Sequence, residues 1–227
     1  MLGGSAIKAR VSMMSGRDSR IVIERCRGGK ACPSVAASGT RLIRDLTALS
    51  ERLAGYSGIS GEEERVPHRK FTLSLSLCPN GCSQPQIADI GIISAVVVRA
   101  DPDACTGCGA CITACRERAI SLDERFLPVI DGRCLQCGDC LRACPSNALL
   151  PGSTGFRILL GGKLGRHPQL GKELPGLFSE EDVVEIVSRG YSLFSEYQRW
   201  IRLGDVINRQ GLAWLPERFL IDKGRQT

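Results

Sequence analysis

Two copies of one cysteine pattern stand close together in the middle of the chain. CTGCGACITAC covers Cys105–Cys115 and CLQCGDCLRACP covers Cys134–Pro145, and both fit C-x2-C-x2-C-x3-C. In this pattern a tight, glycine-containing loop turns three thiolates toward one [4Fe–4S] core, while the fourth cysteine reaches the other core. Residues 101–150 are therefore predicted to form a bacterial-type two-cluster ferredoxin insert.

The spacing assigns the ligands of these two clusters in a crossed arrangement. The first cluster is predicted to bind Cys105, Cys108, Cys111 and Cys144, and the second to bind Cys134, Cys137, Cys140 and Cys115. Crossed ligation holds two centres close together, as fast electron transfer requires. Arg116 stands where the second run has proline. A zinc module with the same spacing is the alternative.

Four of the twelve cysteines remain outside the two runs: Cys26, Cys32, Cys78 and Cys82. They form the pairs CRGGKAC and CPNGC, and four thiolates are the number that a third cubane needs. Buried free cysteines and a zinc site are the alternatives. A disulfide scaffold is disfavoured, because the chain is long, shows no secretory signal and has a core-like hydrophobic content of 43%.

The hydrophobic periodicity on both sides of the runs predicts one α+β domain. Residues 1–100 and 151–227 are expected to form it, with 101–150 as the interruption. The expected elements are strands over 21–24, 70–78 and 157–162, an amphipathic helix over 40–54, a loop over 55–65 and a long helix that begins after Ser179.

Composition narrows the classes of partner and the compartment. The net charge of +6 suits either ordinary solubility or attraction of an anionic ligand or acidic partner. Nucleic acid is not expected, because aromatic residues are 5% of the chain and are not interleaved with basic runs. The apolar runs are too short to span a bilayer, and the first twenty residues lack a signal-peptide core, which favours a cytoplasmic protein.

Three segments together resemble the sulfite/nitrite reductase family, which couples sirohaem to a [4Fe–4S] cluster. They are CRGGKAC, CPNGCSQPQIADIGI and GFRILLGGKLGRHPQLGKEL. The cysteine-rich insert after DIGI is similar to that of dissimilatory and anaerobic sulfite reductases. The tail RLGDVINRQGLAWLPERFL resembles the C subunit of the anaerobic enzymes. The resemblance covers about residues 20–222 and implies a mixed sheet with flanking helices.

The resemblance also implies roles for individual residues. The four cysteines outside the runs would ligate the catalytic cluster, with Cys82 bridging to the sirohaem iron. Arg and Lys side chains would bind the anionic substrate and deliver protons, and others would bind the carboxylates of sirohaem. The candidates are Arg20, Arg69 and Lys70 for catalysis, and Arg25, Lys163, Arg166 and His167 for the cofactor. For each of them a solvated surface charge is the alternative.

Two departures from the family pattern bear on the function. Many relatives carry Lys-x-Lys before C-x3-C, whereas here Lys70 occupies the first of these positions and Thr72 the second. The segment before Cys26 is also shorter than in relatives. We expect three [4Fe–4S] clusters and sirohaem, used to reduce sulfite or nitrite. An electron-donor protein or subunit is the expected partner, within an oligomer or multi-subunit complex. The alternatives are a sirohaem-free multi-cluster electron-transfer subunit and a structural metal-binding module.

Overall fold

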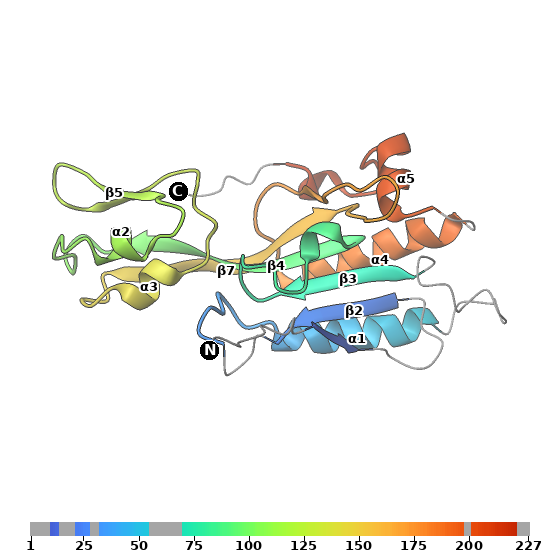
Figure 1. Ribbon diagram of the computed structural model, residues 1–227, viewed down its shortest axis with the longest axis horizontal. Coiled ribbons are helices and arrows are strands. Elements are labelled where there is room, and N and C mark those ends of the chain that lie inside the picture. The colour runs from blue at the N-terminus through green and yellow to red at the C-terminus, as the bar shows by residue number, and fades with distance from the viewer. Residues whose placement is uncertain (1–9, 14–20, 28–31, 55–69, 198–200, 222–227) are drawn as a thin grey trace, which may run out of the picture.

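The computed structural model describes the chain except residues 1–9, 14–20, 28–31, 55–69, 198–200 and 222–227. Its centre is a six-stranded sheet in the order β1-β2-β3-β4-β7-β8 (Figure 1). β2, β3 and β4 are parallel, and the other neighbouring strands are antiparallel. The strands are β1 (Arg10–Met13), β2 (Ile21–Cys26), β3 (Phe71–Ser76), β4 (Ile90–Ala100), β7 (Leu149–Leu160) and β8 (Lys172–Glu173).

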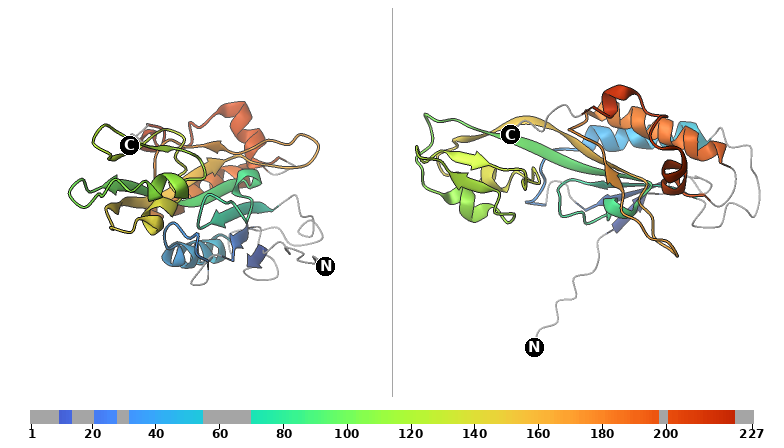
Figure 2. Two further views of the ribbon diagram at one scale, coloured as in Figure 1. Left: turned by 60° about the vertical axis from the view of Figure 1, so that its left-hand side comes forward. Right: turned by 90° about the horizontal axis from the view of Figure 1, so that it is seen from above.

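Two long helices, α1 (Thr40–Ala54) and α4 (Glu180–Glu196), cover one face of the sheet (Figure 2, right). α4 begins with a capping box, in which Ser179 Oγ accepts a hydrogen bond from Asp182 N at 3.1 Å and the Asp182 carboxylate accepts one from Ser179 N. Such a box satisfies backbone N–H groups that the first turn leaves free. A shorter helix, α5 (Leu203–Gln210), and two 3-10 turns, η3 (Pro85–Ile87) and η4 (Glu217–Phe219), complete the main body.

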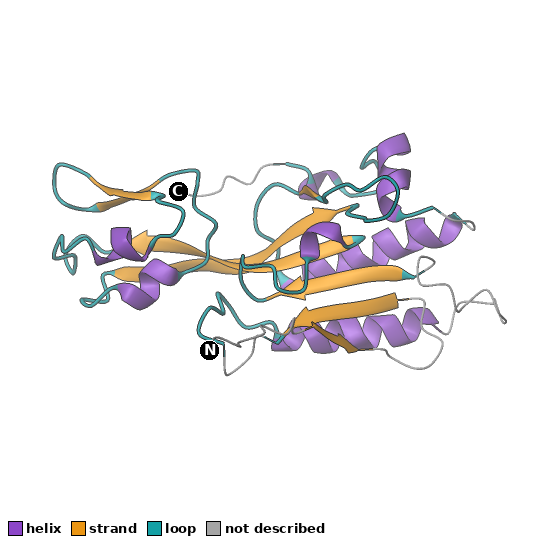
Figure 3. Ribbon diagram, in the orientation of Figure 1, coloured by secondary structure: helices purple, strands orange, loops and turns teal. Residues whose placement is uncertain are grey.

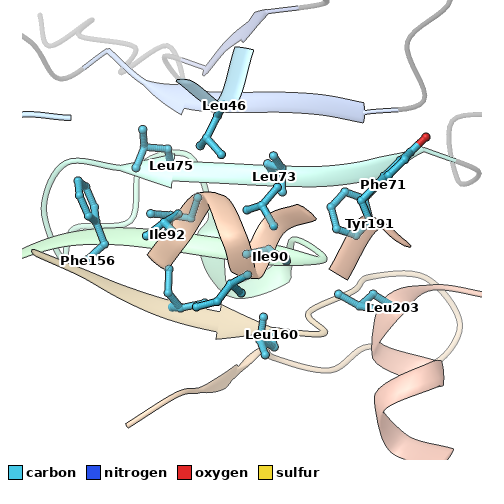
Figure 4. Packing of buried hydrophobic residues seen from close by; sticks show 14 of the residues in the cluster. Leu46, Phe71, Leu73, Leu75, Ile90, Ile92, Phe156, Leu160, Tyr191 and Leu203 are labelled. Carbon is cyan, nitrogen blue, oxygen red and sulfur yellow. The ribbon is translucent and has the colours of Figure 1, made fainter. Parts of the chain in front are cut away.

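The core lies between the sheet and these helices (Figure 4). Alternate residues of β3 point into it, because successive side chains of a strand face opposite sides. Phe71, Leu73 and Leu75 are all at most 1% exposed. The ring of Phe71 meets Tyr191 of α4 edge-on, with the centroids 5.6 Å apart. The strand predicted over 70–78 is therefore present as Phe71–Ser76, but it is buried on both faces and not half-buried, because Ser74 and Ser76 are each 1% exposed.

β4 and β7 continue beyond the sheet as a two-stranded ribbon (Figure 3). Their pairing runs from Ile90↔Leu160 to Ala100↔Leu149, with one irregularity between Val96 and Val98. The ribbon carries residues 101–148, called here the cysteine-rich segment, at one end of the molecule. It contains α2 (Ala110–Ala114), β5 (Ile120–Leu122), β6 (Pro128–Ile130) and α3 (Asp139–Ala143).

The mixed sheet with helices agrees with the predicted fold class. The helix predicted over 40–54 has those bounds, and the predicted strand over 21–24 extends to Cys26. The strand predicted over 157–162 instead begins at Leu149, because β4 pairs with the preceding residues too. The predicted loop over 55–65 lies outside the described residues. Within the described residues, every helix is too short or too polar to cross a bilayer.

Candidate functional site

The four cysteines outside the runs are carried by the ends of two parallel strands. Cys26 is the last residue of β2, and Cys78 follows β3 by two residues. Because the carboxyl ends of parallel strands lie at the same edge of a sheet, these two residues are neighbours. Leu77 N donates a hydrogen bond of 3.4 Å to Cys26 Sγ. Ala36 N donates to Leu77 O at 2.8 Å, which brings the segment after Cys32 to the same edge.

The other three thiols of the set all lie close enough to Cys78 to affect its ionisation. Burial raises the pKa of Cys78, and so do the nearby thiolates of Cys82, Cys26 and Cys32, although a backbone hydrogen bond from Asn80 opposes them. Cys26 and Cys78 are buried, Cys32 is half-buried and Cys82 is exposed. The set therefore has an enclosed side, and Cys82 stands on its solvent side.

The loop that carries Cys82 is held against the face of the sheet opposite the helices. Ser74 Oγ donates to Ser83 O at 2.7 Å, and the hydroxyls of Ser76 and Ser83 are 2.7 Å apart. These serines alternate along β3 with its core leucines. Gly81 adopts a φ of 61°, and a Cβ there would lie 2.9 Å from Gln86 Nε2. Glycine at this position therefore permits the tight turn between Cys78 and Cys82.

The first cysteine run surrounds a pocket. Cys105, Cys108 and Cys111 line it together with Cys144 from the end of the second run. Burial raises the pKa of Cys111, and the thiolates of Cys105 and Cys108 raise it further. The structure therefore brings together the four residues that the spacing assigns to the first cluster.

The second cysteine run is packed against the main body. Val96 N in β4 donates to Gln136 O at 2.9 Å, and Gln136 N donates to Cys134 Sγ at 3.3 Å. Burial, with the thiolates of Cys137 and Cys134, raises the pKa of Cys140 to about 12. Gly138 precedes α3 with a φ of 75°, as Gly109 precedes α2 with 73°. In each run, a glycine in the left-handed backbone conformation thus directs the chain into the helix that carries the third cysteine of that run.

The two crossing cysteines lie between the runs. Cys115 and Cys144 pack against a small hydrophobic cluster that contains Cys111 and Cys140. Cys115 Sγ accepts a hydrogen bond of 3.3 Å from Ala119 N. Among the described residues, no three Cys, His, Asp or Glu side chains converge closely enough to share one metal ion. In a cubane each thiolate binds an iron of its own, so its ligands stand farther apart than those of one zinc ion.

The thiol groups fit iron–sulfur cores in two respects. The pKa of Cys78, Cys111 and Cys140 is raised by burial and by neighbouring thiolates, so a cationic core would relieve the repulsion among them. Backbone N–H groups already point at the sulfurs of Cys26, Cys115 and Cys134. Hydrogen bonds of this kind stabilise thiolate ligands and tune cluster potentials.

The predicted cationic residues are spread over several places. Arg20 and Arg69 lie outside the described residues. Arg25 is half-buried in β2 directly before Cys26, and Lys70 is half-buried just before β3. The resemblance assigns these residues to the cofactor or to the substrate, and the structure leaves those roles as predictions.

The other three predicted cations lie on one loop. Lys163 and Gln169 exchange two backbone hydrogen bonds of 3.0 Å, which close the loop that exposes Arg166 and His167. The ammonium of Lys163 pairs with the carboxylate of Asp205 at the start of α5. Burial alone would raise the pKa of Asp205, but the hydrogen bond and the charge of Lys163 outweigh it and lower that pKa.

Thr72, which departs from the family pattern, belongs to a buried polar network. Its hydroxyl and its backbone N–H both donate to Asp89, at 2.8 and 2.9 Å, and Arg202 donates to the Thr72 hydroxyl at 3.1 Å. Asp89 and Arg202 are absent from the residues predicted by sequence patterns, because they are 113 residues apart along the chain and share no motif. Arg142 is absent from them too, although its guanidinium reaches Val35 O at 3.4 Å.

Comparison with known proteins gives consistent matches. Residues 17–226 match the family described as nitrite and sulphite reductase 4Fe-4S domain. A coenzyme F420-dependent sulfite reductase of Methanocaldococcus jannaschii is 31% identical over 190 residues, which are 82% of this chain and 28% of that protein. The C subunit of the anaerobic sulfite reductase of Salmonella typhimurium is 28% identical over 203 residues, covering 82% of this chain and 57% of that protein.

A solved structure shares the fold. The crystal structure of dissimilatory sulfite reductase I superposes with a TM-score of 0.59 at 20% identity, covering 92% of this chain and 56% of that chain. The chain thus spans less than two thirds of the length of each of these relatives.

Proposed function

The chain belongs to the family of the nitrite and sulphite reductase 4Fe-4S domain, and from this we propose that it is the iron–sulfur part of a sirohaem-dependent sulfite reductase. Sulfite is favoured because relatives are named sulfite reductases. Nitrite is the second candidate substrate. Because one relative is named a subunit, the chain is proposed to work with a partner subunit in a cytoplasmic, multi-subunit enzyme.

The single observation that carries this proposal is the meeting of Cys26, Cys32, Cys78 and Cys82 at one sheet edge. Cys26 and Cys78 are 52 residues apart along the chain, yet Leu77 N donates to Cys26 Sγ, and the thiolates of Cys82, Cys26 and Cys32 all raise the pKa of Cys78. Two distant thiol pairs that converge, with a backbone donor already aimed at one sulfur, suit a third [4Fe–4S] cluster.

The two cysteine runs would form the relay to that cluster. We propose that residues 101–150 act as a two-cluster ferredoxin insert within the domain made of residues 1–100 and 151–227. Each cluster, when bound, accepts and passes on one electron. The pocket lined by Cys105, Cys108, Cys111 and Cys144 supports the crossed ligand set of the first cluster. The packing of Cys115 beside Cys140 supports that of the second.

The sirohaem site would lie on the side where Cys82 is exposed. Sirohaem, when bound, would supply the iron at which sulfite or nitrite is reduced. Lys70, with Arg20 and Arg69, would hold the anionic substrate and supply its protons, and Arg25 would bind the cofactor. Arg166, His167 and Lys163 would bind carboxylates of the cofactor from the loop after β7. The base of this loop is held to η3, where Gly171 N donates to Gln86 O at 2.7 Å.

One observation favours the second candidate function, a sirohaem-free electron-transfer subunit with three clusters. Thr72 is committed to Asp89 and Arg202, and the ammonium of Lys163 is committed to Asp205. Two positions that the resemblance associates with the substrate or the cofactor therefore already have polar partners within the chain.

Anaerobic purification of the chain, with its partner subunit where one co-purifies, separates these candidates. Iron, acid-labile sulfide and extractable tetrapyrrole are measured on the same sample, together with the visible spectrum and sulfite-dependent oxidation of a reduced dye. The proposed function predicts about thirteen irons per chain, about twelve in three clusters and one in sirohaem, together with one tetrapyrrole and sulfite reduction. Full iron without tetrapyrrole supports the electron-transfer subunit. Iron equivalent to two clusters, with the four thiols free to react with an alkylating reagent, overturns the catalytic cluster.

A further inference from the structure

The contacts of the cysteine-rich segment with the main body gather at its second run. Gln136 O accepts a hydrogen bond from Val96 N of β4 at 2.9 Å, and Leu135 O accepts one from the guanidinium of Arg157 in β7 at 3.5 Å. The first run lies near the β5–β6 hairpin, where Phe126 is 65% exposed and its carbonyl is 4.0 Å from Cys105 Sγ. The second run therefore faces the four-cysteine site, and the first run is turned outward.

Arg142 in α3 connects this second run to the main body. Its Nη2 donates to Cys137 O at 3.3 Å and pairs with the carboxylate of Asp139. Its Nη1 donates to Val35 O at 3.4 Å, across the gap to the segment that follows Cys32. The planar guanidinium presents donors on two nitrogens in a fixed fork, so one side chain can bind both carbonyls at once.

The connection continues from Val35 to the four-cysteine site. Ala36, the next residue, donates its N–H to Leu77 O at 2.8 Å. Leu77 is bonded to Cys78 and donates its own N–H to Cys26 Sγ at 3.4 Å. A continuous series of covalent and hydrogen bonds thus runs from Cys137 through Arg142, Val35, Ala36 and Leu77 to Cys26 and Cys78.

We propose that Arg142 is a positioning residue that fixes the second run against the four-cysteine site and provides the bonded path for electrons between them. The proposal rests on the proposed function. In the step concerned, the centre held by the second run loses one electron and the centre held by the four cysteines gains it, and no bond is made or broken.

Arg116 offers a matched control. Its guanidinium pairs with the same Asp139 carboxylate at 3.8 Å, its side chain is 72% exposed, and this pair stays within the cysteine-rich segment. Arg116→Met therefore removes the same charge beside the same carboxylate. It leaves the hydrogen bonds from Arg142 to Val35 and Cys137 in place.

The test uses the holoprotein, reduced by a light-activated donor, and follows the arrival of the electron at the four-cysteine centre by rapid-freeze EPR. Iron content and the midpoint potentials of all centres are measured in parallel. Arg142→Met is expected to slow this arrival by about tenfold or more, the equivalent of roughly 1.4 kcal/mol, at unchanged iron content and potentials. Arg116→Met is expected to match wild type. Amide hydrogen exchange at Ala36 should rise in Arg142→Met alone.

A second variant, Arg142→Lys, distinguishes slower electron transfer from a simple loss of iron. Arg142→Lys keeps the charge beside Asp139 but replaces the fork by one ammonium, so it should keep its iron and still transfer slowly. Electron transfer in both Arg142 variants as fast as in Arg116→Met would overturn the proposal. Loss of iron in both variants would overturn it too, because Arg142 would then only support the structure. Wild-type protein without iron at the four-cysteine site would overturn the proposed function itself, and this proposal with it.

Discussion

Arg202 and Asp89 form an ion pair inside the molecule, in which Arg202 Nη2 and Nε donate to the two carboxylate oxygens at 2.8 and 3.0 Å. The Asp89 side chain is fully buried. It also accepts hydrogen bonds from Thr72 and from the backbone N–H of Leu203. One carboxylate therefore joins β3, the residue before β4 and the start of α5.

Removing the cation of this pair should be costly. Arg202→Met leaves the Asp89 charge buried without its partner, which is expected to lower the free energy of unfolding by about 3–5 kcal/mol. Arg189→Met breaks an exposed pair with Glu185 in α4 and should cost less than about 0.5 kcal/mol. Anaerobic urea unfolding followed by circular dichroism measures both. Equal costs in the two variants would contradict the view that burial of Asp89 decides the effect.

The pair of Lys163 with Asp205 should make stability depend on pH. The pKa of Asp205 is lower in the folded protein than its usual value of 3.8, so the pair stabilises the fold above that value. The stabilisation is lost as the pH falls through the folded pKa. Asp205→Asn should therefore cost about 1 kcal/mol or less at pH 7, because the carboxylate is about one-third exposed, and almost nothing at the acid end.

Thermal unfolding of wild type and Asp205→Asn, scanned from pH 7 downward, measures this difference. Lys163→Met removes the two largest causes of the lowered pKa and leaves the backbone N–H of Arg202 and the charge of Arg209, so in that background Asp205→Asn should show a much smaller pH dependence. A difference between the two proteins that grows as the pH falls would have the wrong sign for this pair.

A methyl group at Gly91 should disturb the loop that carries Cys82. A Cβ at Gly91 would lie 2.0 Å from Pro85 O, which belongs to η3, three residues after Cys82. Gly91→Ala is therefore expected to cost about 1–3 kcal/mol or more, because backbone must move. A Cβ at Gly132 meets nothing within 4 Å, so Gly132→Ala should stay within about 0.5 kcal/mol of wild type. Urea unfolding and iron analysis of both variants decide this.

Serine substitutions should show, by their iron content and visible spectra, that the cysteine sets bind separate clusters. Under the proposed function, Cys78→Ser and Cys137→Ser are each expected to lower the cluster iron from about twelve to about eight per chain, because each removes one ligand of one cubane. Cys78→Ser should also abolish sulfite reduction and disturb the tetrapyrrole bands. Cys137→Ser should leave those bands unchanged. Iron analysis and visible spectra of anaerobically purified variants provide the comparison, and loss of all iron in either variant would count against independent sites.

Sequence patterns predict the elements whose signal is local. α1 shows its apolar face at helical spacing, and α4 adds the cap at Ser179 that marks where it begins. The strand of Phe71, Leu73 and Leu75 follows from simple alternation. The crossed cysteine sets follow from spacing, and the structure brings the first set together around one pocket.

Features that depend on distant partners were out of reach. The first half of β7 contains Pro151 and Gly152, which read as a turn, and it becomes a strand because β4 pairs with it. Thr72 looks like a lost cation until Asp89 and Arg202 are placed beside it. Arg142 reads as one more surface charge, since its acceptor at Val35 lies 107 residues away.

The β4–β7 ribbon closes like a hairpin whose turn has been replaced by residues 101–148. Ala100 and Leu149, the last pair of the ladder, stand opposite each other, as the two ends of a tight turn do. The cysteine-rich segment thus begins and ends at adjacent points of the ribbon, and it interrupts no strand of the six-stranded sheet. Two paired strands therefore hold the cysteine-rich segment at a fixed distance from the sheet.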